Sequence, residues 1–198
     1  MKIGLATPNS DYGQRTTDMA LEAEQRGYDS LWVGEHSHIP ASRQTPHPAG
    51  IELPRLYWHM RDPFTSLGAA AAVTSRIKLV TGVCLLLEHE VLDLAKSVAT
   101  LDEVSDGRFL FGVGVGWNRE ELSNVSPVPW PQGYGAMRET IEALRGQWSP
   151  TGEIRTPSRS RCTASAGRPK RSWSCTKNSA SSGPSSAPLT KPTSTNAS

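Results

Sequence analysis

The first 150 residues of the sequence predict an α/β protein in which helices cover a parallel sheet. Two observations carry this prediction. Short apolar runs alternate with stretches of helical periodicity, and the apolar runs begin near residues 2, 30, 77 and 108. The step is therefore about 30 residues, except where a Pro-rich stretch is inserted. Strands of a parallel sheet are buried on both faces and read as continuous apolar runs, and helices usually connect them.

The first unit begins with an apolar run at Lys2–Thr7, which ends at a proline and so predicts a strand followed by a loop. A helix is predicted next. Either Thr16 or Thr17 can cap its start, and it extends to Arg26, where a glycine follows. The second strand is predicted at Ser30–Gly34.

A stretch with five prolines then runs from residue 36 to residue 63. It is too long for a plain connection, so we expect a functional loop. The pattern of apolar residues predicts the remaining elements in order: a helix at Phe64–Thr74, a strand at Ile77–Val83, a helix over Val91–Val104, a strand at Arg108–Val113 and a helix at Ala136–Trp148.

Four β-α units are half of a (β/α)8 TIM barrel, which typically needs about 250 residues, and they also suit part of an open doubly wound sheet. Periodicity does not decide between the two. A half barrel would leave its inward side chains open, together with two unpaired edges, and this favours homo-oligomers or aggregation. The side chains that we expect to face inward are Leu31, Val33, Leu79, Phe109 and Phe111.

The composition changes sharply near residue 150. Residues 1–150 hold 13 Lys and Arg against 18 Asp and Glu, whereas residues 151–198 hold 8 basic residues and a single acid. The second part is rich in Ser, Thr and Pro, so it cannot bury enough apolar surface to offset backbone ordering, about 1–2 kcal/mol per residue. We therefore expect a folded domain over residues 1–148 and a low-complexity, disordered tail over residues 149–198. The composition of this tail is typical of out-of-frame reading of GC-rich DNA.

Several features concern compartment and partners. The three cysteines show no disulfide or zinc spacing, which favours a reducing compartment, and Cys84 lies in an apolar run that predicts a core position. The N-terminus soon becomes polar, and no apolar run approaches the roughly 20 residues of a membrane span. The basic tail has no repeats and no interleaved aromatic residues. We expect a soluble cytoplasmic protein with no membrane partner and no specific nucleic-acid partner.

The glycines at 112, 114 and 116 invite a comparison with dinucleotide-binding loops. The pattern G-x-G-x-x-G would need glycine at the positions of Trp117 or Arg119, and it belongs after a first strand. Small residues at a strand end let a ligand or a neighbouring segment approach closely. Because the C-terminal ends of barrel strands face the active site, we interpret these glycines as the edge of a ligand site.

The sequence Glu35-His36-Ser37-His38 follows the second strand. Its His-x-His spacing resembles metal hydrolases built on barrels, and a metal-dependent hydrolase is therefore an alternative function. All five histidines precede residue 90, so ligands from later strands are lacking and we expect no metal. His36 is then a structural histidine or a side chain beside a bound cofactor. His38, His47 and His59 are expected to be loop residues.

Two long stretches resemble the luciferase-like monooxygenase family: Ser30–His36 after a helix that ends at glycine, and Ala99–Phe109 running on into Gly112–Trp117. In addition, Ile39–Arg43 with Asp62–Phe64 is similar to a branch thought to use the deazaflavin coenzyme F420. The motifs occur in the family's order over residues 1 to about 148. The resemblance stops abruptly near residue 149, so we expect the N-terminal half of the family's barrel.

The resemblance implies an oxidoreductase that transfers hydride with coenzyme F420, or a monooxygenase that uses FMN, acting on a small-molecule substrate at the C-terminal mouth of the barrel. It implies that His36, with Glu35, lies near the cofactor ring as a catalytic residue. It places Gly82-Val83 at a position where the family often has a cis peptide behind the ring. It also implies that Gly114, Gly116 and Trp117 edge the cofactor site.

A chain truncated to four units would lack the loops after strands seven and eight, where barrels commonly bind phosphate. We therefore expect weak cofactor binding and little or no activity from this chain. A non-catalytic fragment that associates with other chains is the remaining alternative.

Overall fold

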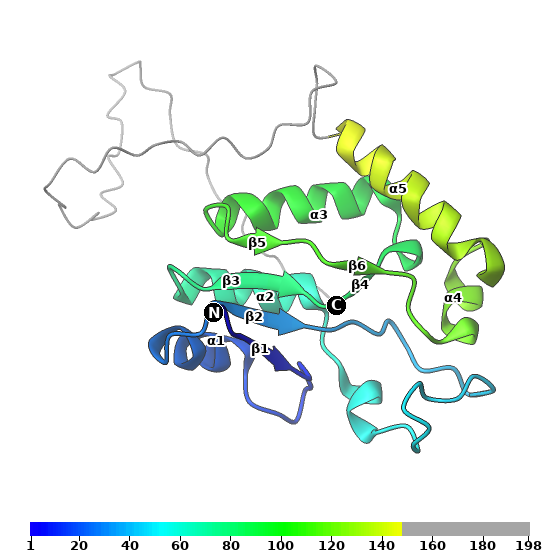
Figure 1. Cartoon of the computed structure of the whole chain (residues 1–198), viewed down its shortest axis with the longest axis horizontal. Helices are drawn as coiled ribbons and strands as arrows, with labels where there is room; N and C mark the ends of the chain where they lie inside the picture. Colours follow the sequence, from blue (N-terminus) through cyan, green and yellow to red (C-terminus); the bar gives the residue numbers. More distant parts are fainter. Residues whose placement is uncertain (148–198) are drawn as a thin grey trace, which may run out of the picture. The chain divides into compact units, whose positions relative to one another are not determined.

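The computed structural model describes residues 1–147, and these form a parallel sheet with helices between its strands (Figure 1). The strand order is β1-β2-β3-β5, and every pairing is parallel. A two-stranded parallel sheet, β4 with β6, lies further along the chain after β3 and β5. The strands are β1 Gly4–Thr7, β2 Ser30–Val33, β3 Lys78–Thr81, β4 Cys84–Leu85, β5 Phe109–Leu110 and β6 Val113–Gly114.

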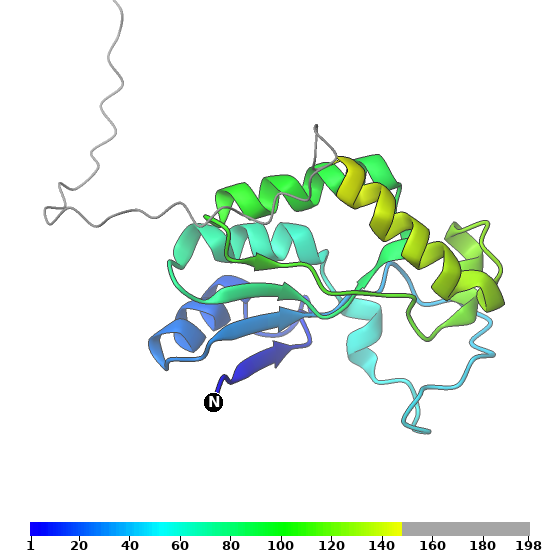
Figure 2. The same ribbon diagram turned by 45° about the horizontal axis from the view of Figure 1, so that its top comes forward.

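The helices α1, α2, α3 and α5 pack against one another in chain order (Figures 1 and 2). This alternation of strand and helix confirms the predicted class, four β-α units of a TIM-barrel type. The helices are α1 Thr16–Gln25, α2 Pro63–Val73, α3 Val91–Val104, α4 Arg119–Val125 and α5 Gly133–Gln147, and the short 3₁₀ segments are η1 Arg55–His59, η2 Leu86–Glu88 and η3 Trp130–Gln132.

The hydrophobic core lies between the sheet and the helices. Leu31, Val33 and Leu79 are fully buried there, and Phe109 and Phe111 pack in the same cluster. The prediction that these five side chains face an open barrel interior is therefore wrong. Successive side chains of a strand point to opposite faces, and both faces of a parallel strand are apolar, so the sequence did not reveal which set meets the helices.

The opposite face of the sheet carries the alternate residues. Trp32 is 40% exposed there, and its indole Nε1 donates to Ser30 Oγ over 2.8 Å. Glycines flank this ring: a Cβ at Gly4 would lie 2.6 Å from Trp32 Nε1, and a Cβ at Gly82 would lie 2.8 Å from Trp32 Cε3. Only residues without a side chain therefore leave room for the indole on this face.

Several element boundaries differ from the prediction. The strand expected at Ile77–Val83 is shortened to β3, and the separate strand β4 follows it; the strand expected at Arg108–Val113 is replaced by the two short strands β5 and β6. The N-cap of α1 is Arg15 and not Thr16 or Thr17, because the Thr16 hydroxyl lies 2.8 Å from Asn9 Oδ1. Helix α4, between the fourth strand and α5, was not predicted.

Arg108, which follows Asp106 and Gly107 after α3, links two helices. Its buried guanidinium donates to the Ser105 carbonyl over 2.7 Å, to the Ala71 carbonyl over 2.9 Å and to Thr74 Oγ1 over 2.8 Å. One planar side chain thus joins the C-terminal ends of α2 and α3. Gly107 makes the preceding turn with φ +71°, a conformation that glycine adopts without steric cost.

The tail predicted over residues 149–198, and Trp148 at the end of the predicted last helix, lie outside the described residues. Across residues 1–147, the structure has no helix both long enough and apolar enough to cross a membrane.

Candidate active site

The residues predicted to form the site all follow the C-terminal ends of strands. Glu35 and His36 come after β2, Gly82 and Val83 after β3, and Gly114 ends β6. The peptide bond between Gly82 and Val83 is cis, as the resemblance implied. A Cβ at Gly114 would lie 2.9 Å from Val83 Cγ2, so the ends of β3 and β6 are in direct contact. The ends of β3 and β6 therefore converge, and the catalytic and cofactor-binding roles assigned to these residues stay predictions.

His36 follows β2, and residues from α4, η1 and the segment after β6 enclose its ring. Its side chain is 7% exposed, and Nδ1 lies 2.6 Å from Glu121 Oε2. The ring makes edge contacts with the rings of Tyr57 and Trp117, at centroid separations of 4.9 and 5.6 Å. Trp117 therefore lies beside His36, and its contact with a cofactor stays a prediction. Nε2 is the ring nitrogen that Glu121 leaves free.

Glu121 was missed by the sequence analysis, although it is the most enclosed acid at the site. Its side chain is 1% exposed, and Oε1 accepts the backbone N–H of Ser37 over 2.9 Å. Helix α4 positions it, because the Asn118 side chain caps that helix by accepting the backbone N–H of Glu121. An Asn followed three residues later by Glu resembles a helix-start signal, and this spacing was the available clue.

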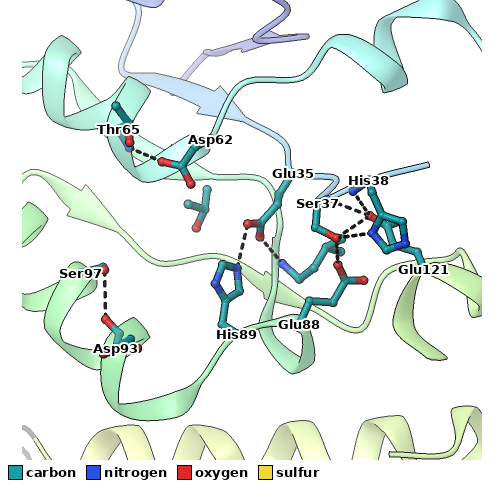
Figure 3. Close-up of polar contacts among 12 residues, drawn as sticks. Glu35, Ser37, His38, Asp62, Thr65, Glu88, His89, Asp93, Ser97 and Glu121 are labelled. Atoms are coloured by element: carbon teal, nitrogen blue, oxygen red, sulfur yellow. Dashed lines mark hydrogen bonds and ion pairs between the residues drawn. The ribbon is translucent and has the colours of Figure 1, made fainter. Parts of the chain in front are cut away.

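Glu35 is directed toward β4 and η2. Its Oε2 accepts the Leu85 backbone N–H over 2.7 Å, and its Oε1 lies 2.8 Å from His89 Nε2 (Figure 3). The hydrogen bond with the Glu35 carboxylate raises the pKa of His89. Both carboxylate oxygens of Glu35 are thus engaged in holding the segment after the cis peptide. This arrangement supports a positioning role, and the predicted catalytic role stays a prediction.

Ser37 links Glu88 to Glu121, as Figure 3 shows. Its hydroxyl donates to Glu88 Oε2 over 2.7 Å and lies 2.9 Å from His38 Nδ1. Burial raises the pKa of Glu88 to about 7, and the charges of Glu121 and Glu35 add to this effect, while the Ser37 hydrogen bond and His89 oppose it. The second histidine of the His-x-His motif therefore belongs to a carboxylate network.

The Pro-rich loop supplies one wall of the site. His47 Nε2 lies 3.0 Å from the Tyr57 hydroxyl, and both rings contact Trp117 edge to face. Beside them is a cleft of about 380 Å³ whose lining includes Arg43, Thr45, His47, Glu52, Trp117 and Asn118. His47 is therefore part of the site, which its assignment as a plain loop residue did not anticipate. His59, by contrast, pairs with Asp11 at 3.0 Å.

Among the described residues, a single group of three side chains brings potential metal ligands together. These are Glu35, Cys84 and His89, with ligand atoms within 4.8 Å of one another. Cys84 occupies the predicted core position, where burial raises the pKa of its thiol and the Glu35 charge raises it further. Because Glu35 and His89 bond to each other and the thiol holds its proton, this donor set fits a metal poorly. Neither His36 nor His38 belongs to it.

Comparison with known proteins gives a consistent family. A family model described as luciferase-like monooxygenase matches residues 1–172. The chain is 45% identical over 152 residues to the uncharacterized protein Rv0953c of Mycobacterium tuberculosis, covering 75% of this chain and 54% of that protein. It is 36% identical over 133 residues to the F420-dependent glucose-6-phosphate dehydrogenase of Beutenbergia cavernae, covering 64% of this chain and 34% of that protein.

The fold is also that of a solved monooxygenase. The oxygenating constituent of 3,6-diketocamphane monooxygenase from Pseudomonas putida, solved in complex with FMN, superposes with a TM-score of 0.58 and 20% identity, covering 75% of this chain and 39% of that chain. The chain therefore spans about half the length of the curated relatives it matches, or less.

Proposed function

The chain belongs to the luciferase-like monooxygenase family, and from this premise we propose that it binds a flavin-type cofactor, coenzyme F420 in preference to FMN, for hydride transfer with a small-molecule substrate. Members of the family are oxidoreductases. The choice of cofactor, the reaction of this chain and its site residues are the parts that we propose.

One observation carries the proposal: an exposed valine after β3 and a buried histidine after β2 both follow the C-terminal ends of neighbouring parallel strands. Val83 is 40% exposed although it lies between two buried segments. Gly82 precedes it, and Gly114 packs against it. Glycines on either side leave the valine as an open, flat contact for a planar ring, while His36 and Trp117 stand at the same edge. These residues fit a flavin-type ring system.

When bound, the cofactor supplies the two-electron hydride chemistry. The residues of this chain orient the cofactor and the substrate and shield them from water. Val83 supports one face of the ring, and the rings of His47, Tyr57 and Trp117 form an aromatic wall that limits access of water. His36 presents a ring nitrogen to the site and can accept or release a proton there, as histidines commonly do.

The preference for coenzyme F420 rests on relatives and on motifs. The relative from Beutenbergia cavernae is named as F420-dependent, and it is more similar to this chain than the FMN-bound camphane monooxygenase is. FMN is the alternative cofactor. The two cofactors support different reactions, since a deazaflavin is confined to hydride transfer, whereas reduced FMN can activate oxygen.

A fluorescence titration of the purified chain with coenzyme F420 and with FMN tests the proposal. We expect Val83→Asp, which places a charge on the ring contact, to raise Kd at least tenfold. Val73→Asp is the matched control, because Val73 is 41% exposed on α2, and it should leave Kd within about threefold. Tenfold corresponds to about 1.4 kcal/mol of binding free energy.

The same titration is repeated with the C-terminal half of the Mycobacterium tuberculosis relative added, in case the chain alone binds weakly. Tighter binding of coenzyme F420 than of FMN, sensitive to Val83→Asp, supports the proposal. Absence of binding both with and without the added C-terminal half, or equal Kd values for Val83→Asp and Val73→Asp, overturns the proposal.

A further inference from the structure

His36 and Glu121 form a buried pair at the mouth of the site. The side chains are 7% and 1% exposed, and Nδ1 lies 2.6 Å from Oε2. The other oxygen of Glu121 accepts the Ser37 backbone N–H over 2.9 Å and lies 3.5 Å from the His38 backbone nitrogen. Both carboxylate oxygens are therefore held, and the one that faces His36 cannot turn away without giving up these bonds.

This geometry fixes the protonation pattern of the imidazole. An ionised carboxylate accepts hydrogen bonds and donates none, so the contact requires a proton on Nδ1. A neutral imidazole carries only one proton, and Nε2 must then hold the lone pair. We propose that Glu121 is a positioning residue that fixes His36 as the Nδ1–H tautomer and so makes Nε2 the proton acceptor of the site. This inference rests on the proposed function, because it assigns the base for that reaction.

The surroundings of the pair leave the Glu121 carboxylate to His36. In the described part of the chain, no Lys or Arg forms an ion pair with Glu121, so His36 is its only ion-pair partner. A further carboxylate, Glu88, is linked to the pair through Ser37, and His38 contacts the same hydroxyl. The Glu121 carboxylate is therefore available to hold the Nδ1–H of His36 while Nε2 exchanges a proton with the substrate.

The chemistry balances for oxidation of a hydroxyl-bearing substrate. The substrate O–H bond would break and an Nε2–H bond would form on His36, and a bound flavin-type cofactor in its oxidised form would supply the acceptor for the hydride of the adjacent carbon. The substrate is then released as a carbonyl compound, and His36 remains as an imidazolium held by Glu121. In the reducing direction, the same Nε2 returns the proton. Carboxylate–histidine pairs orient bases in this way in other enzymes.

Nuclear magnetic resonance of the full chain tests the assignment without cofactor or substrate. Long-range ¹H–¹⁵N correlation spectra of ¹⁵N-histidine-labelled protein report which ring nitrogen carries the proton, and His36→Gln identifies the His36 signals. At a pH where the ring is neutral, we expect the proton on Nδ1. A proton on Nε2 in the wild-type chain overturns the proposal.

Two variants sharpen the test. Glu121→Gln keeps an oxygen for the Ser37 N–H but turns an amide N–H₂ toward His36, so the neutral ring should change to the Nε2–H tautomer. Glu120→Gln is the neighbouring control and should leave His36 unchanged, because Glu120 accepts the Thr45 N–H instead. An unchanged tautomer in folded Glu121→Gln contradicts the proposal. If that variant does not fold, the wild-type tautomer alone decides. Because no cofactor is present, failure here is distinguishable from failure of cofactor binding.

Discussion

His36 Nδ1 lies 2.6 Å from Glu121 Oε2, although 85 positions of sequence separate the two residues. His36 follows the second strand of the main sheet, and Glu121 belongs to the short helix α4 after the fourth. The contact therefore closes the site across β3, which lies between these strands. It joins a loop expected to carry function to a helix that the sequence analysis did not predict.

Stability should fall as pH rises through the range in which Glu88 titrates. Its folded pKa, about 7, is above the value of 4.5 for an unperturbed glutamate, so the folded state binds more protons between these values. The free energy of unfolding should drop by about 1–2 kcal/mol between pH 5 and pH 8, allowing for partial exposure. Urea unfolding at both pH values measures this decrease. It should be absent in Glu88→Gln and retained in Glu142→Gln, because Glu142 is exposed.

Replacing Arg108 by Lys should destabilise the fold by about 2–4 kcal/mol. The guanidinium donates to the Ser105 and Ala71 carbonyls from two separate nitrogens, Nε and Nη2, whereas an ammonium has one nitrogen, so buried acceptors at two helix ends lose partners. Urea unfolding monitored by circular dichroism gives the difference. Arg138→Lys on the exposed side of α5 is the control and should stay within about 0.5 kcal/mol of the wild type. Equal stabilities of the two variants would show that Arg108 does not join the helices.

Two glycine-to-alanine changes should act in opposite directions. A Cβ at Gly112 would overlap the Thr81 carbonyl oxygen, so Gly112→Ala must displace backbone and should cost about 3 kcal/mol or more. Gly68 lies within α2, where a Cβ meets nothing within 4 Å. Gly68→Ala should therefore stabilise the protein by about 0.5–1 kcal/mol. Thermal unfolding of both variants checks the pair, and a neutral Gly112→Ala would contradict the close approach of the two strands.

The start of α2 should depend on Asp62. Its Oδ1 accepts the Thr65 backbone N–H over 2.6 Å, which is the bond of an N-cap residue. Asp62→Ala should lower the free energy of unfolding by about 1 kcal/mol, whereas Asp62→Asn should change it little because asparagine caps helices equally well. A loss of the same size in both variants would point to the charge of Asp62 rather than to its cap.

The order of the strands and helices could be predicted because apolar periodicity is a local property of the chain. Val91–Val104 was predicted as a helix and is one, and the Gly27 that ends α1 has the positive φ expected after a helix. The family motifs were equally local, and they placed His36, Val83 and Trp117 at one edge of the sheet. Cys84 was likewise correctly assigned to the core.

What the sequence by itself determined is therefore the class, the family and the strand ends at which the candidate site lies. Tertiary structure alone decided which alternate residues of each strand meet the helices, because both faces of such a strand are apolar and only packing distinguishes Leu31 from Trp32. It also decided the partners of the polar groups. Glu35 turned toward Leu85 and His89, and Glu121 toward His36. A buried carboxylate must find donors, and which donors lie within reach depends on how distant segments are brought together.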